Sequence, residues 1–379
     1  MGPVYLDCAA TTPSEPAVAE VVLHYLQHEF GNAGSRTHEY GNRAKVATQK
    51  ARTQVGQLVG APREDVIFTS GATESNNLAI LGLSGYAHAN GRLHFITSSI
   101  EHKAVLEPFH RLSQLGFKVT HLAPGPDGIV APETLAEALT ADTTLVSLMH
   151  VNNETGAIQP ISAYCGVLRG HEAFLHVDAA QGYGKLLPEL TDPRIDLMSV
   201  SAHKIFAPKG IGALICRRRE YKIPPLAPLM FGGGQERGLR PGTLPVPLIA
   251  GFGAAAELAM KYHETRKAAC EKIRTVAINE LSGVGGIPNV SAERSITSIL
   301  NISFPGLDSE AIMLALKNLV AVSNGSACTS QSYTVSHVLT SMRLDADRIR
   351  GAIRLSWSHL TPTVPWKQVA QAIAQLQNG

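Results

Sequence analysis

The sequence lacks several features that would place it in a specialised class of protein. Its five cysteines are scattered and form no Cys-x-x-Cys pair. This argues against a disulfide framework or a metal site and favours a reducing compartment. No apolar run reaches the length of a membrane span, and the first residues show no signal-peptide pattern. We therefore expect a cytoplasmic protein without a membrane partner.

The chain also lacks a surplus of charge of either sign. Its 379 residues include 33 Lys and Arg against 31 Asp and Glu. This balance argues against a general electrostatic surface for nucleic acid, so no direct nucleic-acid contact is expected. The basic triplet Arg217-Arg218-Arg219 is interpreted as a solvated strand end. A hydrophobic fraction of 44% is sufficient for a large core in two or three domains.

Apolar runs alternate with helical patterns from about residue 42 to residue 250, which predicts a doubly wound, mostly parallel α/β sheet. Strands are predicted at Val66–Thr69, Leu93–Thr97, Leu145–Met149, Phe174–Val177, Leu197–Ser201 and Gly212–Cys216. Helices are predicted at residues 15–29, Asn42–Val59, Glu74–Gly82 and Ala104–Leu115.

A Pro/Gly-rich stretch at residues 239–247 then interrupts this rhythm, and a long helical pattern follows from about 248 to 282. The last hundred residues predict a smaller α+β unit, with strands near Ser298–Phe304 and Ala352–Ser356. We therefore expect an N-terminal segment (1–14) that joins the small domain, a large domain (15–250) and a small C-terminal domain (251–379).

Asp178 and Lys204 are the most informative pair. Each follows a short apolar run that predicts a buried parallel strand, and sites gather at the carboxyl ends of such strands. A carboxylate and an amine placed there suit a pyridine-aldehyde cofactor. The amine can form a Schiff base with the aldehyde, and the acid can hold a proton on the ring nitrogen. The alternative is a solvated or salt-bridged pair.

Other polar residues near predicted strand ends fit the same ligand. Ala72 and Thr73 follow a strand and a glycine turn, at a helix start that suits a phosphate. Ser201, His203, Gln181 and His102 also follow predicted strands. The first two suit the phosphate as neutral donors, Gln181 suits the phenolic oxygen, and His102 suits stacking and proton transfer. Ordinary capping or strand-end roles are the alternative for each.

Two residues of the last hundred are further candidates for chemistry at a site. Cys328 lies in the small-residue stretch Asn324–Ser330, without the apolar surroundings of a structural cysteine. A thiol on such a loop can enter a pocket and leave it again. Arg354 lies on a predicted strand, and its guanidinium matches a substrate carboxylate. An incidental surface thiol and a structural ion pair are the alternatives.

In this order, the motifs resemble those of pyridoxal-phosphate (PLP) cysteine desulfurases of the NifS/IscS type, class-V aminotransferases of PLP fold-type I. The matching stretches are Tyr5–Asp7, Ala10–Pro13, Thr69–Ser75, Glu101–Leu106, Met149–Glu154, His176–Asp178, Ser201–Lys204, Gly242–Pro245 and Gly325–Ser330.

The resemblance implies a role for each matching residue in a homodimer that acts on L-cysteine. Lys204 carries PLP and moves the Cα proton, His102 stacks on the ring, and Asp178 pairs with its nitrogen. Cys328 attacks the substrate sulfur and becomes a persulfide that a sulfur-acceptor protein receives. The further implied contacts are Ala72, Thr73, Ser201 and His203 at the phosphate, Thr243 at the partner's phosphate, Gln181 and Asn153 at the phenolic oxygen, and Asn153 and Arg354 at the substrate.

The pathway is suggested by finer sequence features. Residues 181–185 and 231–242 are similar to the DndA branch, which supplies sulfur for DNA phosphorothioation. The chain ends at Gly379, without the extended tail that IscS-like members use to dock an iron–sulfur scaffold. A selenocysteine lyase or transaminase, or an assembly subunit without turnover, is the alternative. The lyase or transaminase would make Cys328 dispensable, whereas the assembly subunit would leave L-cysteine unchanged.

Overall fold

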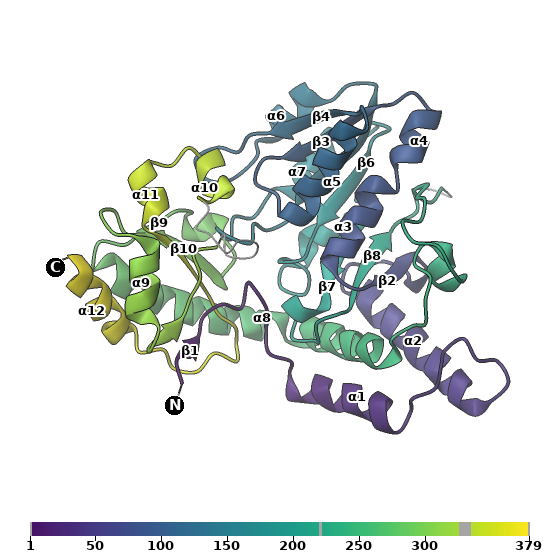
Figure 1. The fold of residues 1–379 in the computed structure, drawn as a ribbon, viewed down its shortest axis with the longest axis horizontal. Helices are drawn as coiled ribbons and strands as arrows, with labels where there is room; N and C mark the ends of the chain where they lie inside the picture. The colour runs from purple at the N-terminus through teal and green to yellow at the C-terminus, as the bar shows by residue number, and fades with distance from the viewer. Residues whose placement is uncertain (1, 220–221, 326–334, 378–379) are drawn as a thin grey trace.

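The computed structural model describes residues 2–219, 222–325 and 335–377. At its centre is a seven-stranded sheet with the order β2-β8-β7-β6-β5-β3-β4, in which β8 runs antiparallel to both of its neighbours (Figure 1). Its strands are β2 (Val66–Thr69), β3 (His94–Ser98), β4 (Lys118–Leu122), β5 (Thr143–Met149), β6 (Phe174–Asp178), β7 (Leu197–Ser201) and β8 (Gly212–Cys216). The predicted α/β fold with a mostly parallel sheet is confirmed.

Helices cover this sheet and remove its apolar strands from water, so that β2, β3, β5, β7 and β8 are buried along their whole length. The helices are α1 (Pro16–Gln27), α2 (Glu39–Gln57), α3 (Ala72–Leu81), α4 (Ser84–Ala89), α5 (Lys103–Gln114), α6 (Pro132–Ala138) and α7 (Ile161–Val167). β4 was not predicted. It lies at one edge of the sheet, and its exposed Lys118 and His121 interrupt the apolar pattern.

A second, smaller group of elements contains an antiparallel sheet of order β12-β10-β9. Its elements are β9 (Ile287–Pro288), β10 (Ile299–Ser303), β12 (Ala352–Ser356), α9 (Ser309–Leu316), α10 (His337–Ser341), α11 (Ala346–Arg350) and α12 (Trp366–Gln377). The N-terminal strand β1 (Val4–Tyr5) joins this group, because it pairs in parallel with β11 (Val320–Ala321).

The helix α8 (Val246–Ser282) belongs to both groups. Ile249 and Phe252 pack in the core beneath the large sheet, whereas Ala277 and Leu281 pack in the core of the smaller group. In Figure 1, α8 runs from the smaller group toward α1 and α2. The expected boundary between residues 250 and 251 therefore falls inside a continuous helix.

Short 3-10 turns complete the chain: η1 (Arg63–Asp65), η2 (Pro188–Thr191), η3 (Ala202–Lys204), η4 (Gln235–Gly238) and η5 (Ala292–Arg294). Of these, η3 directly follows β7 and ends at Lys204. This turn places the lysine at the carboxyl edge of the sheet.

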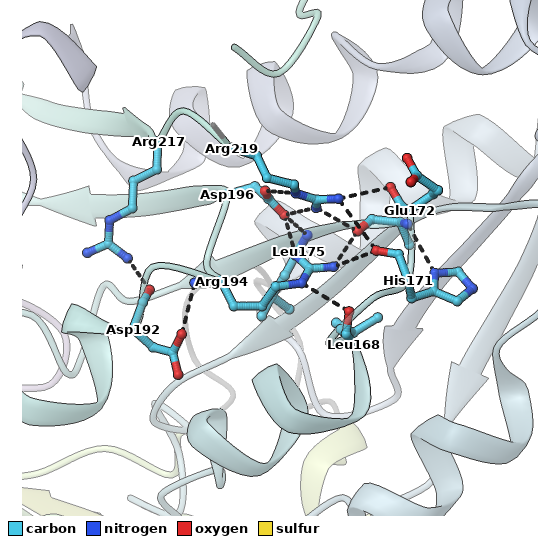
Figure 2. Close-up of polar contacts among 10 residues, drawn as sticks. Leu168, His171, Glu172, Leu175, Asp192, Arg194, Asp196, Arg217 and Arg219 are labelled. Carbon is cyan, nitrogen blue, oxygen red and sulfur yellow. Dashed lines mark hydrogen bonds and ion pairs between the residues drawn. The ribbon is translucent and has the colours of Figure 1, made fainter. Parts of the chain in front are cut away.

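The opposite edge of the sheet is held by a network of charged side chains (Figure 2). Asp196, which is buried just before β7, accepts hydrogen bonds from Arg194 at 2.6 Å and from Arg219 at 2.8 Å. Arg217 is also buried and donates to the carbonyl groups of Asp192 and Leu190. The interpretation of this basic triplet as a solvated strand end is therefore wrong for Arg217 and Arg219, which pair with buried acceptors across the sheet edge.

Candidate active site

A cavity of about 480 Å³ lies at the carboxyl edge of the large sheet. This size is typical of a small-molecule site. Its lining includes ten of the predicted site residues: Ala72, Thr73, His102, Asn153, Asp178, Gln181, Ser201, His203, Lys204 and Arg354. Residues that lie far apart in the sequence are therefore collected at one place because their strands end there.

Asp178 is the last residue of β6, and its carboxylate is buried and directed by two hydrogen bonds. Oδ2 accepts from Asn76 Nδ2 at 2.8 Å, and Oδ1 accepts from the backbone N–H of Ala180 at 2.9 Å. Asn76 lies one helical turn after Ala72 on α3. Sequence reasoning missed it, although the spacing of four residues puts both on the same face of the helix.

Lys204 contacts the N-terminal segment. Its Nζ donates to the carbonyl oxygens of Ala9 and Ala10, the latter at 2.8 Å. The Gln181 side chain donates from Nε2 to the same Ala9 carbonyl at 2.8 Å. Two predicted site residues thus share one backbone acceptor. Every residue has a backbone carbonyl, so the sequence does not indicate which one serves here.

The start of α3 forms a second wall of the cavity. Gly71, which precedes it, has φ 155°, a conformation that favours glycine. Gly212 in β8 allows close approach, because a Cβ there would lie 2.6 Å from the Cα of Gly71. The first N–H groups of a helix lack intrahelical partners, so Ala72 and Thr73 can donate to an anion.

Two polar residues, one at the end of β7 and one just after it, face the same wall. Ser201 supplies a hydroxyl group, and His203 supplies an imidazole whose Nδ1 lies 3.1 Å from the Thr11 hydroxyl oxygen. Burial, together with the charges of Lys204 and Lys209, lowers the pKa of His203 to about 4. The imidazole is therefore neutral at physiological pH, as expected from the sequence. Lys209 also lines the cavity and was not predicted.

His102 caps the N-terminus of α5. Its Nδ1 accepts from the backbone N–H of Ala104 at 3.1 Å, which requires that nitrogen to be unprotonated. Burial is the main cause that lowers the pKa of His102, and Lys204 acts in the same direction while the charge of Asp178 opposes it. A neutral, flat ring on the cavity wall suits stacking against an aromatic ligand.

Glu101 precedes His102 and is completely buried. Its Oε1 accepts from the Ser98 hydroxyl at 2.6 Å and from the backbone N–H of Met149 at 3.0 Å, so it links the ends of β3 and β5. Burial raises the pKa of Glu101 to about 8, and the charge of Asp178 adds to this effect. Glu101 belongs to the matching stretch Glu101–Leu106, but sequence reasoning assigned no role to it.

Arg354 enters the cavity from β12, in the smaller group of elements. Its Nη2 donates to Asp7 Oδ1 at 2.6 Å, and its Nη1 donates to the carbonyl oxygen of Asn153 at 2.9 Å. A guanidinium has five N–H donors, so it can hold these partners and still bind a carboxylate. Arg354 thereby positions Asn153 on the same wall.

Cys328 lies outside the residues that the structure describes. The nearest described residues on either side, Gly325 and Val335, line a groove that also includes His102 and Asn153. Both ends of the segment therefore lie beside the cavity. Thr243 is exposed and does not line the cavity of its own chain.

The side chains of the cavity fit PLP. A directed, buried carboxylate suits a protonated ring nitrogen, and an amine within the same cavity suits the aldehyde. A helix start, with a neutral histidine and a serine, suits the phosphate. A neutral imidazole on the wall completes a site for a flat ring.

Comparisons with known proteins agree with this chemistry. The Aminotransferase class-V family matches residues 4–361. The chain is 46% identical to "Cysteine desulfurase IscS" of Shewanella sediminis. The 365 aligned residues cover 95% of this chain and 89% of that protein. The structure of DndA from Streptomyces lividans is 49% identical, with a TM-score of 0.83 over 95% of this chain and 100% of that one. A "NIFS-LIKE PROTEIN" structure is 34% identical, with a TM-score of 0.91 over the full length of both chains.

The chain belongs to the aminotransferase class-V family. The prediction of a PLP-dependent cysteine desulfurase of the NifS/IscS type is confirmed, and the selenocysteine lyase or transaminase alternative is not favoured. Among the described residues, no helix combines the length and the apolar character needed to cross a membrane.

Proposed function

We propose that the enzyme binds L-cysteine in this cavity and removes its sulfur atom, so that L-alanine is released and the sulfur is transferred to Cys328 as a persulfide. The observation that carries the proposal is the convergence of Asp178, Lys204 and Arg354 on one cavity. These groups match the ring nitrogen and the aldehyde of PLP and the carboxylate of an amino acid, respectively.

Bound PLP supplies a ring that accepts electrons from the substrate Cα. Lys204 holds the cofactor aldehyde and moves the Cα proton. Asp178 keeps the ring nitrogen protonated, and Arg354 orients the substrate carboxylate. The remaining contacts that we propose are Ala72, Thr73, Ser201 and His203 at the phosphate, His102 on the ring face, and Gln181 and Asn153 at the phenolic oxygen, with Asn153 also near the substrate.

The sulfur transfer requires Cys328 as a thiolate, because the thiolate is the nucleophile. Its sulfur attacks the substrate sulfur, and the Cβ–S bond of the substrate breaks as the S–S bond forms. The electron pair of the broken bond remains with the substrate carbon, which takes up a proton and leaves as part of alanine. A reductant or an acceptor protein then removes the outer sulfur.

The first experiment measures cofactor attachment and product together. Purified protein with PLP should show a visible absorbance band, and borohydride should attach the cofactor covalently to Lys204. With L-cysteine and a reductant, alanine and sulfide should form in equal amounts. A colourless protein that borohydride cannot label would contradict the cofactor site.

A cysteine variant separates the persulfide step from the cofactor chemistry. Cys328→Ser should keep the visible band and lose nearly all sulfide release from L-cysteine. Cys270→Ser, which changes a buried thiol outside the cavity, is the matched control and should retain activity. Undiminished sulfide release by Cys328→Ser would refute the persulfide.

We also propose that the enzyme is a homodimer in which Thr243 reaches the phosphate site of the partner. Thr243 is exposed, as are the large apolar side chains of Phe30, Val46 and Phe231. Sedimentation should give twice the mass of the chain, and Thr243→Ala should weaken PLP binding. A monomer with a full complement of PLP would contradict this proposal.

For the pathway, we propose the DndA branch, in which the sulfur serves DNA phosphorothioation through an acceptor protein in the cytoplasm. The 49% identity to the DndA structure supports this choice over iron–sulfur assembly. Transfer of radiolabelled sulfur from the loaded enzyme to candidate acceptors tests it. Exclusive transfer to an iron–sulfur scaffold would refute it.

The division into residues 1–14, 15–250 and 251–379 remains a proposal for the domains. Limited proteolysis would test it. Cleavage near residue 246, where α8 begins, would support a boundary close to residue 250, whereas cleavage near residue 282 alone would place the boundary at the other end of this helix.

A further inference from the structure

A second cavity adjoins the proposed cofactor site, and Ala9 lines both. Apolar side chains such as Phe206, Ile299 and Trp357 form much of its wall, and Lys185 lies among them. Lys185 does not line the cofactor cavity. It can therefore act on the chemistry through its charge, which contributes to the lowered pKa of His203, or through a side chain that it contacts.

Lys185 has few polar partners, although it lies among apolar side chains at the second cavity. Its Nζ donates to Gln181 Oε1 at 3.5 Å, and in the described part of the chain no carboxylate forms an ion pair with it. Burial lowers the pKa of Lys185 to about 8, against the smaller opposing effects of Cys8 and Cys270. Within the described ranges, Gln181 is thus the one side chain to which Lys185 donates a hydrogen bond.

The bond to Gln181 belongs to a short series. Gln181 accepts from Lys185 at Oε1 and donates from Nε2 to the Ala9 carbonyl, to which Lys204 also donates. A glutamine amide has one accepting end and one donating end. The reversed amide would place oxygen against the Ala9 carbonyl and N–H against the lysine, so both contacts would become repulsive.

We propose that Lys185 is a positioning residue that fixes the orientation of the Gln181 amide. Its donor holds Oε1 on the side of the second cavity, so Nε2 always faces the cofactor site and the Ala9 carbonyl. The Ala9 carbonyl, to which Lys204 donates, is then also held in place by the Gln181 amide. The inference rests on the proposed function in one respect, namely that Lys204 is the residue that holds PLP.

The test measures how fast the visible band grows when PLP is added to protein from which the cofactor has been removed. Lys185→Met removes the donor and fills the apolar cavity. It should slow the growth of the band about fivefold, as expected for the loss of one hydrogen bond. Lys185→Arg keeps a donor and should recover most of the rate. Lys267→Met changes an exposed lysine at the same cavity and should match the wild type.

A double variant identifies the route of the effect. If Lys185 acts only through Gln181, then adding Lys185→Met to Gln181→Leu should change nothing further, so the two effects should not add. Replacing a buried cation with an apolar side chain is often tolerated. Lys185→Leu is the second variant if Lys185→Met does not fold.

The outcomes separate this inference from the proposed function. Equal rates for Lys185→Met and the wild type would overturn the inference, as would additive effects in the double variant. A wild-type protein that never develops the band would instead refute the proposed role of Lys204.

Discussion

Replacing Glu101 with glutamine should flatten the pH dependence of the stability of this protein. Burial raises the pKa of Glu101 from 4.5 to about 8, with a further contribution from the charge of Asp178. The unfolded chain therefore releases this proton near the ordinary glutamate value, whereas the folded chain keeps it to a much higher pH. Stability is fully present below the unfolded pKa and is lost as the pH rises through the folded pKa.

The size of the effect follows from the two pKa values. Each pH unit between them removes about 1.4 kcal/mol of unfolding free energy, so the wild type should lose about 5 kcal/mol through this group. Glutamine cannot titrate, and its Oε1 can still accept from Ser98 and Met149. The titratable groups that interact with this region, including Asp178, His102 and Tyr164, are present in both proteins. Their contributions therefore largely cancel in the comparison.

Between about pH 5 and about pH 8 this group should account for about 3.5 kcal/mol, which urea unfolding would measure as the difference between the variant and the wild type. Glu101→Gln should gain stability relative to the wild type as the pH rises. Glu107→Gln, at an exposed position on α5, is the control and should follow the wild type at both pH values. If the wild-type and Glu101→Gln stabilities change in parallel, Glu101 does not hold its proton in the folded state and the reasoning is wrong.

Three further substitutions test other parts of the structure. Asn76→Leu leaves Asp178 Oδ2 without its side-chain donor and should weaken PLP binding about tenfold, measured by equilibrium dialysis; unchanged affinity would show that Asn76 does not orient the carboxylate. Arg354→Lys should raise the KM for L-cysteine about tenfold or more, because an ammonium cannot reproduce the guanidinium fork; an unchanged KM would place the substrate carboxylate elsewhere. Asp196→Ala should lower the unfolding free energy by about 3 to 5 kcal/mol in urea, because it removes the carboxylate that pairs with Arg194 and Arg219 and leaves them with carbonyl acceptors alone, and folded protein should keep its visible band; a neutral change would refute the structural role of the network.

The central sheet was largely predictable because its strands are covered on both faces and therefore read as uninterrupted apolar runs. β2, β7 and β8 were predicted with the observed bounds. β4 was missed because this edge strand is largely open to solvent and carries polar residues, whereas β2 at the other edge is buried throughout. The long helix predicted from about 248 to 282 is observed as α8. That it packs in both cores was not predicted, since a helix shared by two cores gives no change in pattern at the point where one core ends.

The site was predictable where a side chain follows a strand, as for Asp178 and Lys204. The contacts that direct these side chains were not. Asn76 orients Asp178 from a different element, and the acceptors of Lys204 are backbone carbonyls near the N-terminus. Such contacts depend on which segments meet in the fold, and the composition of each segment does not specify its neighbours.

The position of the N-terminal segment has a consequence for biosynthesis. Its strand β1 pairs with β11, and Asp7 is held by Arg354, which the ribosome adds 347 residues later. Part of what holds the segment beside Lys204 is therefore made only when the C-terminal strands are. We expect the site to be completed, and the cofactor to be bound stably, only once those strands have left the ribosome.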